Sequence, residues 1–93
     1  ILCGDAHMLA ADDGRSSDYT GVSGLRLPVL HGSPLDQDAS LKGGPYSHGT
    51  HLPGPGEGCF GWVNVHDEGG EVRVEFTGCD EFNEVRVRLA FTV

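Results

Sequence analysis

Residues 60–93 read FGWVNVHDEGGEVRVEFTGCDEFNEVRVRLAFTV. Two apolar segments in this stretch, 60–65 and 72–76, flank the loop DEGG at 67–70. Because glycine accepts the positive φ of tight hairpin turns, the two segments are expected to pair as antiparallel strands. Apolar and polar residues alternate in the second segment, which is the pattern of a strand with one buried face.

The same alternation returns in residues 85–93, after a second turn that we expect near residues 77–80. Three consecutive strands joined by short turns make an antiparallel meander. Ile, Leu, Val and Phe together number eight in residues 1–30, three in 31–59 and twelve in 60–93. The last third is therefore the part of the chain that most clearly predicts a sheet.

The middle segment, residues 31–59, has too few large apolar side chains to build a core of its own. It is also rich in glycine and proline, which interrupt helices and strands. We expect a long Gly/Pro-rich loop here, either disordered or held in place by its neighbours and by ligands.

The first third is less regular. Residues 1–3 are apolar and predict a short buried strand, and residues 25–30 predict another. Between them, residues 6–11 are compatible with a helical turn, and residues 12–18 with an exposed acidic loop. The chain also opens directly on an apolar run without an initiator methionine, which we interpret as the sign of a fragment of a larger protein.

Size and charge limit the function classes. Ninety-three residues allow one small domain or a part of one. The formal net charge is −8 with six Lys and Arg residues, so no basic surface for nucleic acid or for anionic membranes is expected. No apolar run approaches the roughly 18 residues that a transmembrane helix needs, so we expect no transmembrane segment in this chain.

The three cysteines fit no zinc-site or disulfide-framework spacing, and at least one of them is unpaired within the chain. Cys3 lies in the first apolar run and is expected to be a small buried residue. A disulfide between Cys59 and Cys79 stays open as an alternative.

Asp5 and His7 are the first candidates for chemistry. They follow the apolar run that opens the chain, two positions apart, with Gly4 before them. A carboxylate and an imidazole suit Zn, Mn or Fe, and a strand end is a common place for metal ligands. The alternative is a solvated aspartate and a hydrogen-bonded histidine at an ordinary strand end.

The other histidines give weaker signals. His31 also ends an apolar run, and His48 and His51 are three apart in the glycine-rich segment, where they either bind metal or are simply exposed. His66, at the hairpin tip, is expected to have no function. Lys42, followed by two glycines, lacks the spacing of a P-loop and predicts a tight turn, with contact to a substrate as the minor alternative.

Three blocks of sequence agree in order and spacing with one known family. They are Gly4-Asp5-Ala6-His7-Met8 through Asp12-Asp13-Gly14, then Leu27-Pro28-Val29-Leu30-His31-Gly32-Ser33-Pro34-Leu35-Asp36, then Lys42-Gly43-Gly44-Pro45-Tyr46-Ser47. From residue 1 to about residue 78 the chain resembles the C-terminal portion of an alkaline phosphatase D-like protein. These proteins belong to the calcineurin-like metallophosphoesterases.

The resemblance implies an αββα sandwich, an α/β and β-rich fold with a two-metal centre at its strand ends. The family's Gly-Asp-x-His motif matches Gly4, Asp5 and His7. His7 would bind one metal ion and Asp5 would bind or orient the other, so both would be catalytic. The ions would be divalent or trivalent (Zn, Mn, Fe or Ca), and the substrate a phosphate ester that His31 contacts or supports. A secreted or cell-envelope location would also fit the family.

Our first hypothesis is the C-terminal part of a metal-dependent phosphoesterase that hydrolyses phosphomonoesters or phosphodiesters. Residues 1–93 would then be one partial domain: an active-site strand and the segment after it (1–30), a Gly/Pro-rich loop (31–59) and the meander (60–93). The N-terminal portion of the domain, with most metal ligands, would be missing, and the fragment alone would be inactive. The alternatives are a small acidic β-rich binding module without catalysis and a purely structural domain.

Overall fold

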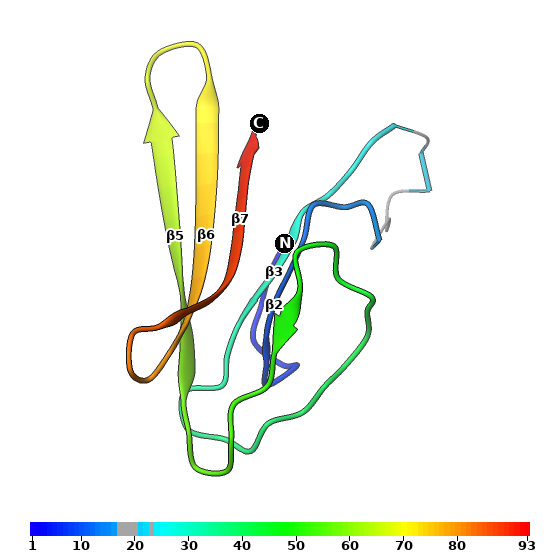
Figure 1. The fold of residues 1–93 in the computed structure, drawn as a ribbon. Helices are drawn as coiled ribbons and strands as arrows, with labels where there is room; N and C mark the ends of the chain where they lie inside the picture. Colours follow the sequence, from blue (N-terminus) through cyan, green and yellow to red (C-terminus); the bar gives the residue numbers. More distant parts are fainter. Residues whose placement is uncertain (17–20, 23) are drawn as a thin grey trace.

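The computed structural model describes residues 1–16, 21, 22 and 24–93 (Figure 1). This part of the chain contains seven strands in two sheets, joined by turns and loops. These residues contain no helix. Within the same ranges, no helical segment has the length and hydropathy that a membrane crossing requires. The fold is therefore β-rich, and its last three strands form the expected antiparallel meander.

The first sheet has four short strands in the order β1-β3-β2-β4. They are β1 (Leu2–Cys3), β2 (Leu9–Asp12), β3 (Val29–Gly32) and β4 (Thr50–His51). Strand β3 runs parallel to β1 and antiparallel to β2, and β4 pairs antiparallel with the other edge of β2. All four residues of β2 are buried, whereas β1 is an exposed edge strand.

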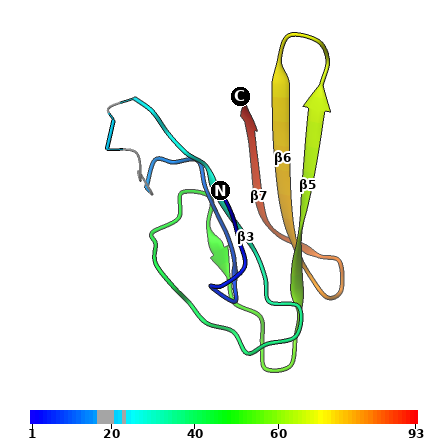
Figure 2. The same cartoon turned by 180° about the vertical axis from the view of Figure 1, so that it is seen from behind.

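The second sheet is the meander β5 (Cys59–Asp67), β6 (Val72–Asp80) and β7 (Val85–Thr92). The first hairpin closes as expected, with Asp67 opposite Val72. The second turn is later than expected, because β6 continues through a register irregularity at Gly78 and Cys79 and ends at Asp80. Figures 1 and 2 show the β5–β6 hairpin extending past the first sheet.

Three expectations for the first third are wrong. Residues 6–11 form no helical turn, since β2 begins at Leu9 and is covered on both faces, which favours a strand. The strand at residues 1–3 is not buried: Leu2 is 69% exposed on the sheet edge. The second strand begins only at Val29, because Pro28 has no N–H to donate to a ladder.

The Gly/Pro-rich segment is an ordered loop held by the first sheet. The His48 amide donates to the Ala11 carbonyl (2.9 Å), and the Ala11 amide donates to the Gly49 carbonyl (3.2 Å). Farther along, the Cys59 amide donates to the Pro34 carbonyl. The loop therefore takes its shape from hydrogen bonds to its neighbours and not from a core of its own.

All three cysteines are free thiols. Cys59 lies opposite Asp80, and Cys79 lies opposite Phe60, one position along the ladder. Side chains one position apart on a ladder point to opposite faces, so a Cys59–Cys79 bond does not form. Cys3, expected to be buried, is half-exposed on the edge strand.

The main core lies between the two sheets. It contains apolar side chains from both layers: Leu9, Ala11 and Leu30 from the first sheet, and Cys59, Phe76, Val87 and Leu89 from the second. Glycine allows the closest approach of the two layers. A Cβ on Gly61 would stand 2.7 Å from Phe76 Cε2 and 3.2 Å from Gly32 Cα.

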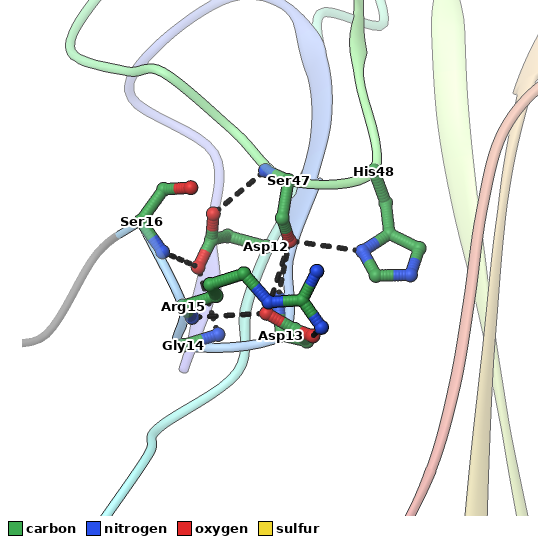
Figure 3. A network of polar contacts seen from close by, with 7 residues as sticks. All are labelled: Asp12, Asp13, Gly14, Arg15, Ser16, Ser47 and His48. Carbon is green, nitrogen blue, oxygen red and sulfur yellow. Dashed lines mark hydrogen bonds and ion pairs between the residues drawn. The ribbon is translucent and has the colours of Figure 1, made fainter.

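A buried carboxylate at the end of β2 fixes the loop to the sheet (Figure 3). Asp12 is completely buried, which corrects the expected exposed acidic loop; Asp18 lies outside the described residues. Asp12 Oδ1 accepts hydrogen bonds from the amides of Gly14 (2.7 Å) and Ser16 (3.2 Å). Its Oδ2 accepts one from the amide of Ser47 (2.7 Å), 35 residues away.

These bonds set the protonation state of Asp12. Burial is the largest single influence and opposes ionisation, but the bonds from Ser47, Ser16 and Gly14 together outweigh it and lower the pKa of Asp12. The Ser47 hydroxyl strengthens the same junction by donating to Asp13 Oδ1 (3.1 Å). The segment that contains Tyr46 is thereby positioned against the first sheet.

The Gly32→Ala substitution tests the contact between the layers. Its methyl group would stand 3.1 Å from Gly61 Cα and 3.2 Å from Gly61 N in the second sheet, so we expect the free energy of unfolding to fall by about 1–3 kcal/mol. Gly4→Ala is the matched control, because no atom lies within 4 Å of the added Cβ. Urea unfolding measures both variants, and equal midpoints would contradict the close approach of the sheets.

The Asp12→Asn substitution tests the buried carboxylate. The amide group would turn a donor toward the Ser47 amide, so we expect a loss of about 1–3 kcal/mol in the free energy of unfolding. Asp36→Asn, at an exposed position, is the control and should stay within about 0.5 kcal/mol of the wild type.

The Asp12→Asn variant should also differ from the wild type in how its stability depends on pH. Because the pKa of Asp12 is lower in the folded chain than the ordinary value of 3.8, its stabilisation is present above pH 3.8 and is lost as the pH falls through the folded-state pKa. Below pH 3.8 the Asp12→Asn variant should therefore lose less stability than the wild type. If the free energy of unfolding fell equally for the two proteins below pH 3.8, Asp12 would not be the ionised group that holds the loop.

Candidate functional site

Asp5 and His7 lie in the turn that carries the chain from β1 to β2. These two strands are not neighbours, because β3 lies between them, so the turn passes over the end of β3. His7 has a φ of 43°, a left-handed conformation that few residues other than glycine adopt. The Ser33 hydroxyl donates to the Gly4 carbonyl (2.8 Å), and the Ser40 amide donates to the His7 carbonyl (3.1 Å).

Asp5 points into solvent and is paired with Lys42. Its side chain is 95% exposed, and its Oδ2 lies 3.0 Å from Lys42 Nζ, which also donates to the Asp5 carbonyl (3.0 Å). The hydrogen bond from Lys42, followed by the charge of Lys42, lowers the pKa of Asp5. The carboxylate is therefore ionised at neutral pH and already has a cationic partner.

His7 is half-buried and bonded through one ring nitrogen. Its Nδ1 lies 2.9 Å from the carbonyl oxygen of Asp38. Because a carbonyl oxygen only accepts, Nδ1 carries the proton, and the lone pair of the neutral ring is on Nε2. Histidines that bind metals usually donate their other N–H to a carbonyl or carboxylate in this way.

The two residues fit a metal centre only in part. His7 offers a correctly polarised Nε2, but the Asp5 carboxylate is engaged by a lysine, and a cation there competes with a metal ion. In the described part of the chain, no group of three or more His, Cys, Asp or Glu side chains could hold a metal ion. A complete centre would need further ligands and the release of Asp5 from Lys42.

His31 lies on β3 and is 8% exposed. Its ring meets the Tyr46 ring edge-on, with centroids 5.4 Å apart, and Nε2 lies 3.4 Å from the Tyr46 hydroxyl. That hydroxyl donates to the Lys42 carbonyl (2.7 Å), so Nε2 is the donor in this long contact and Nδ1 carries the lone pair. Nδ1 is buried and has no hydrogen-bond partner among the described residues, and burial lowers the pKa of His31.

A cavity of about 370 Å³ connects Asp5 with His31. Its lining consists of Ile1, Cys3, Asp5, Ala6, Val29, His31, Lys42, Gly43 and Tyr46. The structure thus brings two of the three candidates from the sequence into one site, whereas His7 is not part of the lining. Substrate contact by Lys42 was only a minor alternative, and the sequence did not indicate that Tyr46 lies here. The separation of 37 residues between Asp5 and Lys42 carries no signal of contact.

The remaining histidines lie elsewhere. His48 Nδ1 is 2.9 Å from the Ser47 hydroxyl (Figure 3), and His51 lies in β4. His66, near the hairpin tip, is 3.1 Å from a carboxylate oxygen of Glu75. None of the three contributes to the cavity beside Asp5.

No protein-family model, curated protein or solved structure was found to match this chain. Any function assigned to it therefore rests on the geometry of the residues above and on the motif in which they occur.

The His31→Gln substitution tests the buried neutral imidazole. Burial lowers the pKa of His31 below its ordinary value of 6.5, so below pH 6.5 the unfolded chain binds more protons than the folded one and stability falls. The variant should lose this part of the pH dependence, measured as the free energy of unfolding from pH 7.5 downward. His51→Gln is the control and should keep it; identical profiles for the wild type and His31→Gln would contradict a neutral His31.

Proposed function

We propose that this chain is the C-terminal part of a metal-dependent phosphoesterase related to the alkaline phosphatase D-like proteins. The observation that carries the proposal is the hydrogen bond from His7 Nδ1 to the Asp38 carbonyl, because it leaves Nε2 available to a metal ion. Asp5, two residues earlier in the same turn, would be the second ligand. The turn and its motif, Gly4 to His7, are the same ones that suggest the family.

The edge of the first sheet supports the proposal. Among the described residues, strand β1 pairs with β3 alone and its other edge has no partner strand, with Ile1 55% and Leu2 69% exposed. Apolar side chains on an open strand edge favour a further covering element. An N-terminal portion of the same domain, carrying the other metal ligands, would supply that element and complete an αββα sandwich.

In the complete enzyme, His7 and Lys42 would have different roles beside the metal ions. A bound pair of divalent or trivalent ions (Zn, Mn, Fe or Ca) would polarise the phosphoryl group of the substrate and supply a nucleophilic hydroxide. His7 would hold its ion through Nε2 in the orientation that Asp38 fixes. Lys42 brings a positive charge to the same sheet end, and its third N–H, which Asp5 does not engage, would bind a phosphoryl oxygen.

The first test is a Zn²⁺ titration of the 93-residue chain, followed by the ¹⁵N signals of the imidazole rings. Before metal is added, His7 should show the Nδ1–H tautomer. Its Nε2 signal should then respond at lower Zn²⁺ concentrations than the signals of His48 and His51. The His7→Ala variant should lose the tightest site, whereas the matched control His51→Ala should keep it.

Two results would contradict the proposal. One is a Zn²⁺ response centred on His48 and His51 with His7 unaffected, which favours a binding module. The other is a coding sequence that lacks upstream Asp-x-His and Gly-Asn-His motifs, since these supply the remaining ligands in the resembled family.

A further inference from the structure

We infer that the cavity beside Asp5 receives the organic group of the phosphate ester, and that this group is planar and apolar. The inference rests on the proposed function, because it assigns a substrate class to the same site. It concerns the cavity, whose lining includes Asp5 and Ala6 of the Gly4–His7 turn but not His7.

The position of the cavity supports the inference. It lies on the face of the first sheet that is turned away from the meander, beneath the loop that contains Lys42 and Tyr46. Asp5 is at its rim, so a phosphoryl group held by the Gly4–His7 turn would have its leaving group directed toward the cavity. Lys42 is at the same rim and offers a charge to the phosphoryl end.

The lining favours an apolar group over a sugar or an anion. Ile1, Ala6 and Val29 contribute hydrocarbon, and Tyr46 contributes an aromatic ring. Ligand pockets typically combine a mostly apolar wall with a few polar groups of this kind. The volume of about 370 Å³ suffices for an aromatic ring with its linking atoms, since an apolar cavity of roughly 150 Å³ already holds benzene.

His31 adds a second, independent observation. It is a buried, neutral ring that belongs to the lining, and its Nδ1 makes no hydrogen bond within the described part of the chain. Buried polar atoms normally have partners, so the unpaired Nδ1 makes the His31 ring an unusual part of the lining. A neutral ring also does not attract a second anion, which leaves Lys42 as the cationic group for the phosphoryl end.

The experiment is a metal-free binding assay on the full 93-residue chain, in the presence of a chelator. Phenylphosphonate, inorganic phosphate and benzyl alcohol are titrated separately while backbone amide signals are recorded. We expect phenylphosphonate to shift the amides of Val29, His31 and Tyr46 in a saturable way. Its dissociation constant should be at least about tenfold lower than that of inorganic phosphate.

Two variants distinguish binding in the apolar cavity from binding of the phosphoryl group at Lys42. Cys3→Leu narrows the cavity without removing a hydrogen bond among the described residues and should weaken phenylphosphonate binding about tenfold. Lys42→Met should weaken phenylphosphonate but leave benzyl alcohol unchanged. Val65→Leu, on the exposed part of β5, is the matched control and should change neither; unchanged amide spectra outside the cavity establish that each variant is folded.

Three outcomes overturn the inference: no saturable shift with phenylphosphonate, equal affinities for phenylphosphonate and inorganic phosphate, or binding that Cys3→Leu does not affect. Because no metal is present, these results are independent of the Zn²⁺ titration. Zinc bound at His7 together with an empty cavity would contradict only the substrate class. An occupied cavity without zinc at His7 would contradict the phosphoesterase proposal instead.

Discussion

Burial of β2 on both faces is the constraint on which the rest of the structure depends. Leu9 and Ala11 face the meander and join the core between the sheets, whereas Met8 and Ala10 face the other way, toward Tyr46. A strand that is covered on both sides needs two layers around it. The meander provides one layer, and the ordered Gly/Pro-rich loop provides much of the other.

The same strand positions the candidate site. At its C-terminal end, Asp12 bonds the amide of Ser47 and so fixes the loop on which Tyr46 and Lys42 lie. At its N-terminal end, β2 is preceded by the turn that contains Asp5. Lys42, from the loop that Asp12 fixes, donates a hydrogen bond to Asp5. Lys42 and Tyr46 of this loop are part of the lining, so the shape of the open cavity depends on a buried carboxylate that does not belong to the lining.

The meander was predictable because the sequence features that specify it lie within residues 60–93 themselves. Alternation and a Gly-Gly turn specify the β5–β6 hairpin whatever surrounds it. The first sheet was predicted less well, since its strands have two to four residues and their burial depends on distant partners. Residues 6–11 are compatible with a helical turn until the two layers that cover residues 8–11 are known. Asp5 and His31 were identified from their place after apolar runs, but Asp12 was not, because a buried carboxylate is recognisable only by the amides that it binds.

We propose that the turn from Gly4 to His7 is a metal-binding element. Its most direct test is paramagnetic broadening of the backbone amide signals by substoichiometric Mn²⁺. We expect the signals of residues 4–8 and 38–42 to broaden first, while those of residues 66–71 at the hairpin tip stay sharp. Broadening centred on the hairpin tip or on residues 12–16, with residues 4–8 unaffected, would contradict it.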